Sequence, residues 1–245
     1  MGLLNFKKSL ANNSAVANSF LAINLKKGKT EDQCKCIDFF LGTADTQAAN
    51  SGCGCLKKAV SGGWSIDDYC AHVDKIVNSL NLKQRAIEKI GLDESQISEI
   101  PPILLSSFRR GENLYYKTNA NHTKFVTNKY SVTWIFFSAT QIYTYTYEFD
   151  TTSDNSLENT RDFFYSDVTC IRTEHEVEEN IYEVNAKGCG CSKPKESKYV
   201  HQNRHWDTLQ ITVPSDSYSF YCRTNETIEQ SIQAAKAMIR EKKQA

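Results

Sequence analysis

Hydrophobic residues recur at helical spacing in the first part of the chain. The clearest case is the segment 65–80, where one apolar stripe is formed by Ile66, Tyr69, Val73, Ile76, Val77 and Leu80. Ser65 can cap this helix, and Asp67 and Asp68 favour its positive end. Further helices are expected over residues 10–25, 82–90 and 94–100, with stops at Gly91 and Pro101. We therefore predict that residues 1–108 form a helical, cysteine-bearing N-terminal region.

From Gly111 onward, apolar and polar residues alternate, which is typical of β-strands. The strongest case is the segment 141–149, whose one face carries Gln141, Tyr143, Tyr145, Tyr147 and Phe149. The other strand candidates are residues 114–118, 123–127, 130–137, 163–172, 181–184, 204–213 and 217–222. A tyrosine stripe could stack bases or line a ligand groove. Tyrosine and threonine also pair well across neighbouring strands, so we interpret the stripe as core.

One amphipathic helix is predicted at the end of the sequence, over residues 225–243. Asn225 can cap it, and its apolar positions recur at helical spacing: Ile228, Ile232, Ala235 and Ile239. Short antiparallel strands leave exposed sheet edges, and a helix with a single apolar face can cover an open end of such a sheet. We therefore expect the second part of the chain to be a sheet or open barrel closed by this helix.

Five stretches of this part follow one another in a characteristic order: residues 111–116, 130–147, 164–171, the last strand pair and residues 225–243. In pattern and element order, residues 110–245 resemble the bacterial pleckstrin-homology-like (PH-like) domains. The resemblance implies an α+β chain in which a seven-stranded antiparallel barrel or sandwich, capped by the C-terminal helix, follows the helical region. The expected domains are residues 1–108 and 109–245. An insertion at residues 187–199 leaves the pairing of the fifth and sixth strands open.

Composition and charge narrow the classes of function. With 40% hydrophobic and 11% aromatic residues, the 245-residue chain has the balance of a folded globular protein. Its 29 Lys and Arg residues equal its 29 Asp and Glu residues, so no net field attracts nucleic acid or an anionic membrane. No apolar stretch reaches the roughly 18 residues needed to cross a bilayer, and the first residues lack the apolar core of a signal peptide. We expect a cytoplasmic protein that binds no nucleic acid and does not integrate into a membrane.

Six of the nine cysteines occur as Cys-x-Cys pairs: Cys34 with Cys36, Cys53 with Cys55, and Cys189 with Cys191. A loop could bring the first two pairs around one ion, and Zn²⁺ is the default ion for a closed set of four thiolates. A spacer of one residue fits a strained local disulfide or free loop thiols equally well. Zinc bound by Cys34, Cys36, Cys53 and Cys55 is therefore one hypothesis beside those two alternatives, and no other cofactor is expected.

The third cysteine pair precedes His201 and His205, which adds the ligand types of a two-cysteine, two-histidine zinc site. In a strand these histidines stand about 13 Å apart and cannot hold one ion together. Because the following residues have a strand pattern, we interpret both as solvated histidines near a hairpin. His175 stands among glutamates at positions 174, 176, 178 and 179, which indicates a charged surface turn. Such an acidic cluster can also bind a divalent cation weakly.

The remaining cysteines and histidines give no catalytic pair. Cys70 and His72 are two residues apart on one predicted helix, so their side chains point about 200° apart and cannot act on each other. Cys170 and Cys222 lie in strand candidates beside apolar neighbours, which is typical of small core residues. We therefore expect a protein that is not an enzyme.

The leading hypothesis is a non-enzymatic interaction or scaffold protein. The resemblance implies a module that presents a sheet edge, or the groove beside its C-terminal helix, to a protein partner. Binding of a phosphate headgroup needs a cluster of basic residues around the loop that joins the first two strands. This region has only two lysines, Lys117 and Lys124, so the sequence does not support such binding. The alternative is a zinc-binding or thiol-redox-responsive regulatory protein that uses the Cys-x-Cys pairs. The sequence leaves the partner's identity and homo-oligomer formation open.

Overall fold

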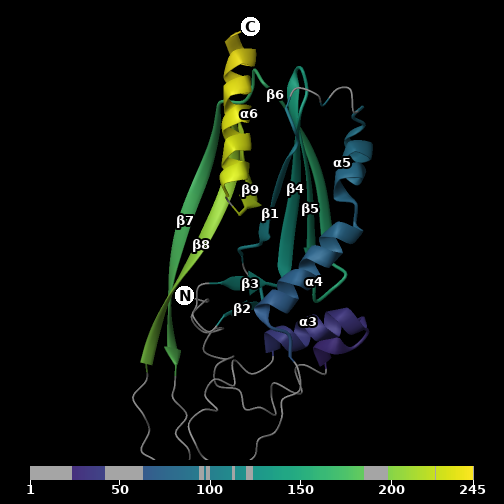
Figure 1. Cartoon of the computed structure of the whole chain (residues 1–245), viewed down its shortest axis with the longest axis vertical. Helices are drawn as coiled ribbons and strands as arrows, with labels where there is room; N and C mark the ends of the chain where they lie inside the picture. The colour runs from purple at the N-terminus through teal and green to yellow at the C-terminus, as the bar shows by residue number, and fades with distance from the viewer. Residues whose placement is uncertain are drawn as a thin grey trace, which may run out of the picture.

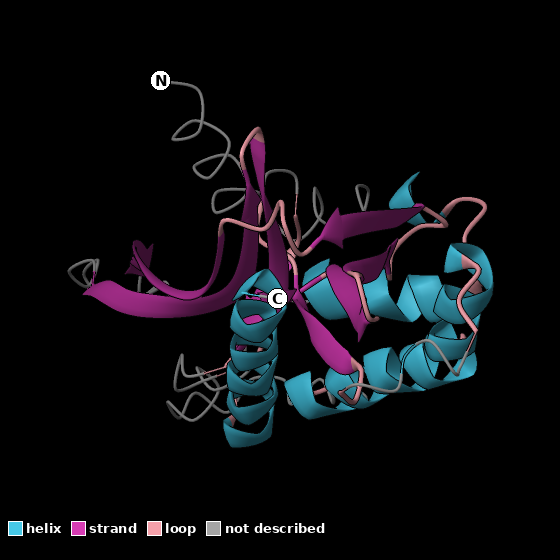
Figure 2. Cartoon of the chain, turned by 90° about the horizontal axis from the view of Figure 1, so that it is seen from above, coloured by secondary structure: helices cyan, strands magenta, loops and turns pink. Residues whose placement is uncertain are grey.

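A computed structural model describes residues 24–41, 63–93, 97, 100–111, 114–119, 124–184, 198–223 and 225–244. Within these ranges the protein combines helices with three antiparallel sheets (Figures 1 and 2). The predicted mixture of helix and sheet is confirmed, and so is the C-terminal helix. None of the three sheets closes into a barrel in this described part of the chain.

The described elements are as follows. The helices are α3 (Glu31–Leu41), α4 (Ile66–Ser79), α5 (Leu82–Ile90) and α6 (Glu226–Gln244). The strands are β1 (Ile103–Phe108), β2 (Tyr116–Thr118), β3 (Phe125–Thr127), β4 (Lys129–Phe137), β5 (Gln141–Asp150), β6 (Ser156–Phe164), β7 (Cys170–Val184), β8 (Lys198–Val213) and β9 (Asp216–Cys222). They pair in the orders β1-β4-β5-β6, β2-β3 and β7-β8-β9.

Helix α4 begins where the sequence predicted it. The Ser65 hydroxyl accepts the backbone N–H of Asp68 at 3.1 Å, and the Asp68 carboxylate accepts the N–H of Ser65 at 2.9 Å. These reciprocal bonds form a capping box. Helix α5 stops at Gly91, whose φ of 74° is left-handed and therefore favours glycine. No described helix is long and apolar enough to span a membrane.

In the four-stranded sheet, the central strand β4 is buried on both faces, whereas the edge strand β6 is mostly exposed. On one face, α4 and α5 pack on alternate residues of β4 and β5, including Val132, Phe136 and Tyr145. Ile135 and Ile142 point to the opposite face and join a second core. Tyr145 is fully buried, and the other tyrosines of the predicted stripe pack against the same core. The interpretation of the stripe as core is therefore confirmed.

The second core lies between this sheet, the three-stranded sheet and α6. The buried face of α6 is formed by Ile232, Ala235 and Ile239, which belong to one cluster with Leu209 and Ile211 of β8. These three helix residues are members of the apolar stripe that the sequence predicted. Figure 1 shows the resulting order of layers: α4 and α5, then the four-stranded sheet, then the three-stranded sheet with α6.

Three elements differ from the sequence-based expectation. Residues 103–108, expected within the helical region, form strand β1, because Ile103 and Leu105 alternate toward the second core. The expected single strand 163–172 is interrupted by a turn at residues 165–167 and divides between β6 and β7. The cysteine-bearing segment around Cys34 is helical, since a reciprocal pair of bonds between Thr30 and Gln33 starts α3.

The remaining sequence predictions fall as follows. The pairing left open by the insertion is now defined, because β7 and β8 pair from Cys170 with Thr212 to Val184 with Lys198. His175 lies inside β7 and not in a surface turn, so that interpretation was wrong.

Residues 10–23 and most of 94–100 lie outside the described residues. The helices α3 to α5 contribute to a core shared with β4 and β5, and the domain boundary at residue 108 stays a prediction.

Candidate interaction groove beside the C-terminal helix

The predicted zinc ligands are only partly within the described residues. Cys34 and Cys36 lie two positions apart on α3, which directs their side chains about 200° apart. Cys36 is fully buried, and this burial raises the pKa of its thiol to about 11. Cys34 is half-buried, with its Sγ 3.9 Å from the carbonyl oxygen of Lys26. Cys53 and Cys55 lie outside the described residues, so the four-thiolate zinc site stays a prediction.

The other cysteines and histidines fall in several places. Cys189 and Cys191 are outside the described residues. His201 and His205 both lie in β8, which confirms the strand geometry that argued against a shared ion. Cys222 is buried as expected, and burial raises its pKa to about 12. Cys170 is exposed, so its interpretation as a core residue was wrong.

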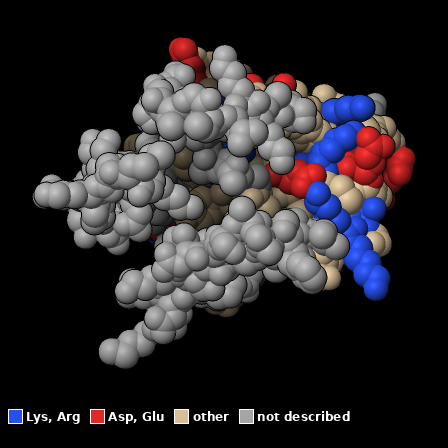
Figure 3. Space-filling view, turned by 90° about the horizontal axis from the view of Figure 1, so that it is seen from below, with Lys and Arg blue, Asp and Glu red and all other residues tan. Residues whose placement is uncertain are grey.

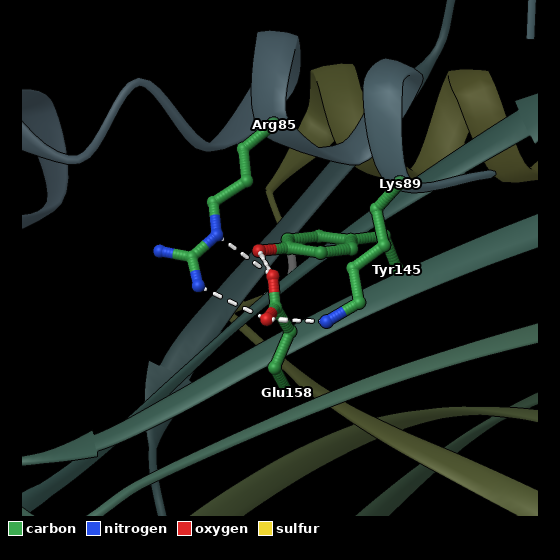
Figure 4. Close-up of polar contacts among 4 residues, drawn as sticks. All are labelled: Arg85, Lys89, Tyr145 and Glu158. Carbon is green, nitrogen blue, oxygen red and sulfur yellow. Dashed lines mark hydrogen bonds and ion pairs between the residues drawn. The ribbon is translucent and has the colours of Figure 1, made fainter. Parts of the chain in front are cut away.

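The most strongly perturbed carboxylate belongs to an ion-pair cluster at the interface of α5 with β5 and β6 (Figure 4). Arg85 donates two hydrogen bonds to Glu158, at 2.8 and 3.0 Å, and Lys89 donates a third at 2.5 Å. Tyr145 donates a fourth from below the helix. The Arg85 bonds in particular lower the pKa of Glu158 to about 2. Because four donor atoms share its two oxygens, this carboxylate anchors α5 to the sheet.

A groove of about 260 Å³ lies between the start of β7 and the C-terminal half of α6. Its described lining comes from two short stretches: Val168, Thr169, Cys170 and Ile171 on one side, and Lys236, Ile239, Arg240 and Lys243 on the other. In Figure 1 the upper part of β7 runs beside α6. The groove lies beside the C-terminal helix, where the family resemblance implies a binding surface.

The helical repeat explains the charge of this groove. Lys236, Arg240 and Lys243 are spaced by four and three residues, so they form a stripe next to the buried face that carries Ile239. They lie toward the C-terminal end of α6, where positive charge is favourable. Lys243 donates to the carbonyl oxygen of Val168 and so ties the helix to the strand. No Asp or Glu is among the described lining residues, so the groove is positively charged.

The strand on the other side of the groove is an outer strand. In the three-stranded sheet, β7 pairs with β8 alone among the described strands. Its start is fixed by Thr169, which donates its backbone N–H and its hydroxyl to the carbonyl oxygen of Thr212, at 2.8 and 2.9 Å. An outer strand presents backbone donors and acceptors that a further strand can use. The groove therefore offers a strand edge and a basic wall together.

Charge elsewhere on the described surface is mixed. Seen from below, basic and acidic side chains lie next to each other on the part that is described (Figure 3). On β7, Glu174 is paired with Arg172 at 2.7 Å, and Glu176 is paired with Arg110. These pairs neutralise much of the acidic run that the sequence shows in this strand. The basic groove is therefore set apart from its surroundings by having a single sign of charge.

Sequence reasoning did not identify this basic groove. The sequence does contain a sign of its basic wall, because the spacing of Lys236, Arg240 and Lys243 places them on one side of the predicted helix. What could not be inferred is that this side meets residues 168–171, which lie some 65 positions earlier and approach only through tertiary packing. No family model, no curated protein and no solved structure matches the chain.

Proposed function

We propose that the protein is a non-enzymatic interaction protein that binds an extended, acidic segment of a partner protein in the groove between β7 and α6. The observation that supports this proposal most directly is that the outer strand β7 lies opposite a basic, partly apolar wall formed by α6. An extended peptide can add to a sheet edge through main-chain hydrogen bonds, while pockets beside the edge select its side chains. Here Ile171, which is partly exposed, provides an apolar contact, and the three basic residues provide attraction for Asp or Glu.

The order of elements supports a PH-like module. Strands β1, β4, β5 and β6 form one antiparallel sheet, β7, β8 and β9 form another, and α6 follows. The family resemblance implies seven antiparallel strands and a capping helix within residues 110–245; these two sheets have seven strands and are followed by α6, but β1 lies before that range. The hairpin β2-β3 stands between the first two strands as an addition. The proposal therefore treats residues 109–245 as the binding module, with β1 contributed from just before it.

The chemistry of the described residues supports binding and not catalysis. Glu158 has a strongly lowered pKa, but all of its donors come from the protein and hold a helix in place. Burial raises the pKa values of the Cys36 and Cys222 thiols, which keeps them protonated and poorly nucleophilic at neutral pH. We therefore assign the groove a recognition role.

The test is a selection of random peptides of about eight residues, the length of a typical strand, displayed on phage and panned on the full chain. Selected peptides should be enriched in Asp and Glu and in β-branched residues. They should bind Lys236→Glu/Arg240→Glu about tenfold more weakly, which corresponds to about 1.4 kcal/mol. Lys27→Glu/Lys75→Glu is the matched control, because it makes the same change of net charge at two exposed lysines outside the groove, one in a turn and one on α4.

Two results would contradict the proposal. One is selection of peptides without acidic enrichment, or recovery of no binding sequence at all. The other is equal loss of affinity in the groove variant and in the control, which would indicate a long-range effect of net charge. Folding of both variants is checked by their urea unfolding midpoints, which should match the parent because all four substituted residues keep part of their surface in solvent.

A further inference from the structure

Two histidines and an aspartate meet on the ribbon formed by β7 and β8. His175 Nδ1 lies 2.6 Å from Asp207 Oδ1, and His175 Nε2 lies 3.2 Å from His205 Nδ1. The strand register explains the meeting, because His175 is directly opposite Asp207 and His205 is opposite Val177. Residues 175 and 205 are therefore diagonal neighbours on one face of the ribbon. His205 thus approaches a histidine of the other strand, 30 positions away in the sequence.

We propose that His175 and His205 together bind a Zn²⁺ ion, with Asp207 as the residue that orients His175. An imidazole nitrogen binds zinc at about 2.0–2.1 Å, so two such nitrogens on one ion are about 2.9 Å apart at a right angle and about 3.4 Å apart at a tetrahedral angle. The observed 3.2 Å lies between these limits. The two nitrogens are thus already at the separation that a shared ion requires.

The aspartate sets the proton positions that this site needs. The carboxylate of Asp207 accepts the Nδ1 proton of His175, which leaves the lone pair of Nε2 directed toward His205. A carboxylate behind a zinc-binding histidine is a common arrangement, since it fixes the ring and makes the ligand more basic. Without an ion, His205 donates its Nδ1 proton to His175 Nε2. On zinc binding that proton moves to His205 Nε2, so a neutral His205 changes tautomer and no net charge is lost.

The surroundings favour a cation. The carboxylate of Asp207 lies next to His175 on the same face of the ribbon, whereas Glu174 and Glu176 are adjacent along β7, point to the opposite face and are paired with arginines. His175 is 56% exposed and Asp207 19%, which leaves one side of the site open to water. Among the described residues, no group of three or more His, Cys, Asp or Glu side chains is arranged to hold a metal. The proposed site thus has two protein ligands, His175 and His205, and water would occupy the remaining positions around the ion.

The test uses the full chain labelled with ¹⁵N and follows the imidazole nitrogens by NMR while ZnCl₂ is added. This readout reports each ring separately, so zinc bound by cysteines does not mask it. The signals of His175 Nε2 and His205 Nδ1 should shift together with one common affinity. Asp207→Asn should weaken that affinity about tenfold or more, as loss of a partner behind a metal ligand typically does. His72→Ala, on α4, is the control and should leave the titration unchanged.

Three outcomes would overturn the proposal. The first is that neither ring shifts at up to about 1 mM ZnCl₂. The second is that His205→Ala leaves the zinc-dependent shift of His175 unchanged, which would mean binding to a single ring. The third is that Asp207→Asn binds zinc with the same affinity as the parent, which would show that Asp207 does not orient His175 for binding. Both altered residues belong to the hairpin and not to a buried core, and backbone amide spectra verify that the fold is kept.

Discussion

Replacing Glu158 with Gln should destabilise the protein by removing a charge from the interface between α5 and the sheet. The amide of Gln keeps the size of the side chain and can still accept the hydrogen bond of Tyr145, so the change isolates the ion pairs with Arg85 and Lys89. The bonds from Arg85, Lys89 and Tyr145 together lower the pKa of Glu158 from 4.5 to about 2, with Arg85 making the largest contribution. A difference of that size corresponds to about 3 kcal/mol of stabilisation at neutral pH.

Solvent reduces this figure. Glu158 is only 16% exposed, but Arg85 and Lys89 are 44% and 47% exposed, so water and salt screen the cationic side of each pair. We therefore expect a loss of about 1–2 kcal/mol in the free energy of unfolding at pH 7. Glu241→Gln is the control, because this exposed carboxylate near the end of α6 has no ion pair among the described residues, and the control should lose less than about 0.5 kcal/mol.

The dependence on pH gives the second half of the test. Because the pKa of Glu158 is lower in the folded protein than in the unfolded chain, its contribution is complete above about pH 4.5 and disappears as the pH falls toward 2. Urea unfolding at pH 7, 4 and 3 should therefore show a difference between Glu158→Gln and the parent that shrinks with falling pH. A difference that is absent at pH 7, or that stays constant down to pH 3, would refute the account of this cluster.

Three further predictions follow from the packing. Tyr69→Phe should lower the free energy of unfolding by about 1–3 kcal/mol in urea titrations, because the hydroxyl of this fully buried residue bonds to the carbonyl oxygen of Thr127 and the hydroxyl of Thr151; an unchanged midpoint would contradict this role. Ser65→Ala should cost about 1 kcal/mol by the same measurement through loss of the capping box, whereas a neutral effect would mean that α4 does not depend on its cap. In brief iodoacetamide labelling at pH 8 followed by mass spectrometry, Cys170 should react well before Cys36 and Cys222, since it is exposed and the other two are buried with raised pKa values; the reverse order would disprove the burial pattern.

The sequence was most informative where local rules act alone. Ser65 followed by Asp68 specifies the start of α4, and the tyrosines of β5 alternate strictly enough to fix which face is buried. Helix α3 was missed although Thr30 and Gln33 form the same kind of start signal, because the Cys-x-Cys pattern suggested a loop. The helix start at Thr30 and Gln33 therefore determines the structure of this segment, and the loop that the cysteine spacing suggested does not form.

Elements whose stability comes from distant partners were harder to predict. Strand β6 has few apolar residues and exposes Leu157 and Phe164, so its pairing with β5 is what makes it a strand. The approach of His205 to His175 depends on the register of two strands separated by an insertion. The groove has the same character, since α6 supplies its basic wall while the start of β7 supplies its edge.

The central claim, that β7 and α6 together bind an extended acidic segment, is tested most directly by hydrogen–deuterium exchange of the full chain with and without an acidic peptide selected on it. We predict that the peptide protects backbone amides at the start of β7, from Cys170 onward, and in the second half of α6, while amides of α4 and α5 exchange as before. Protection confined to α4 and α5, or unchanged exchange in β7 at saturating peptide, would contradict the claim.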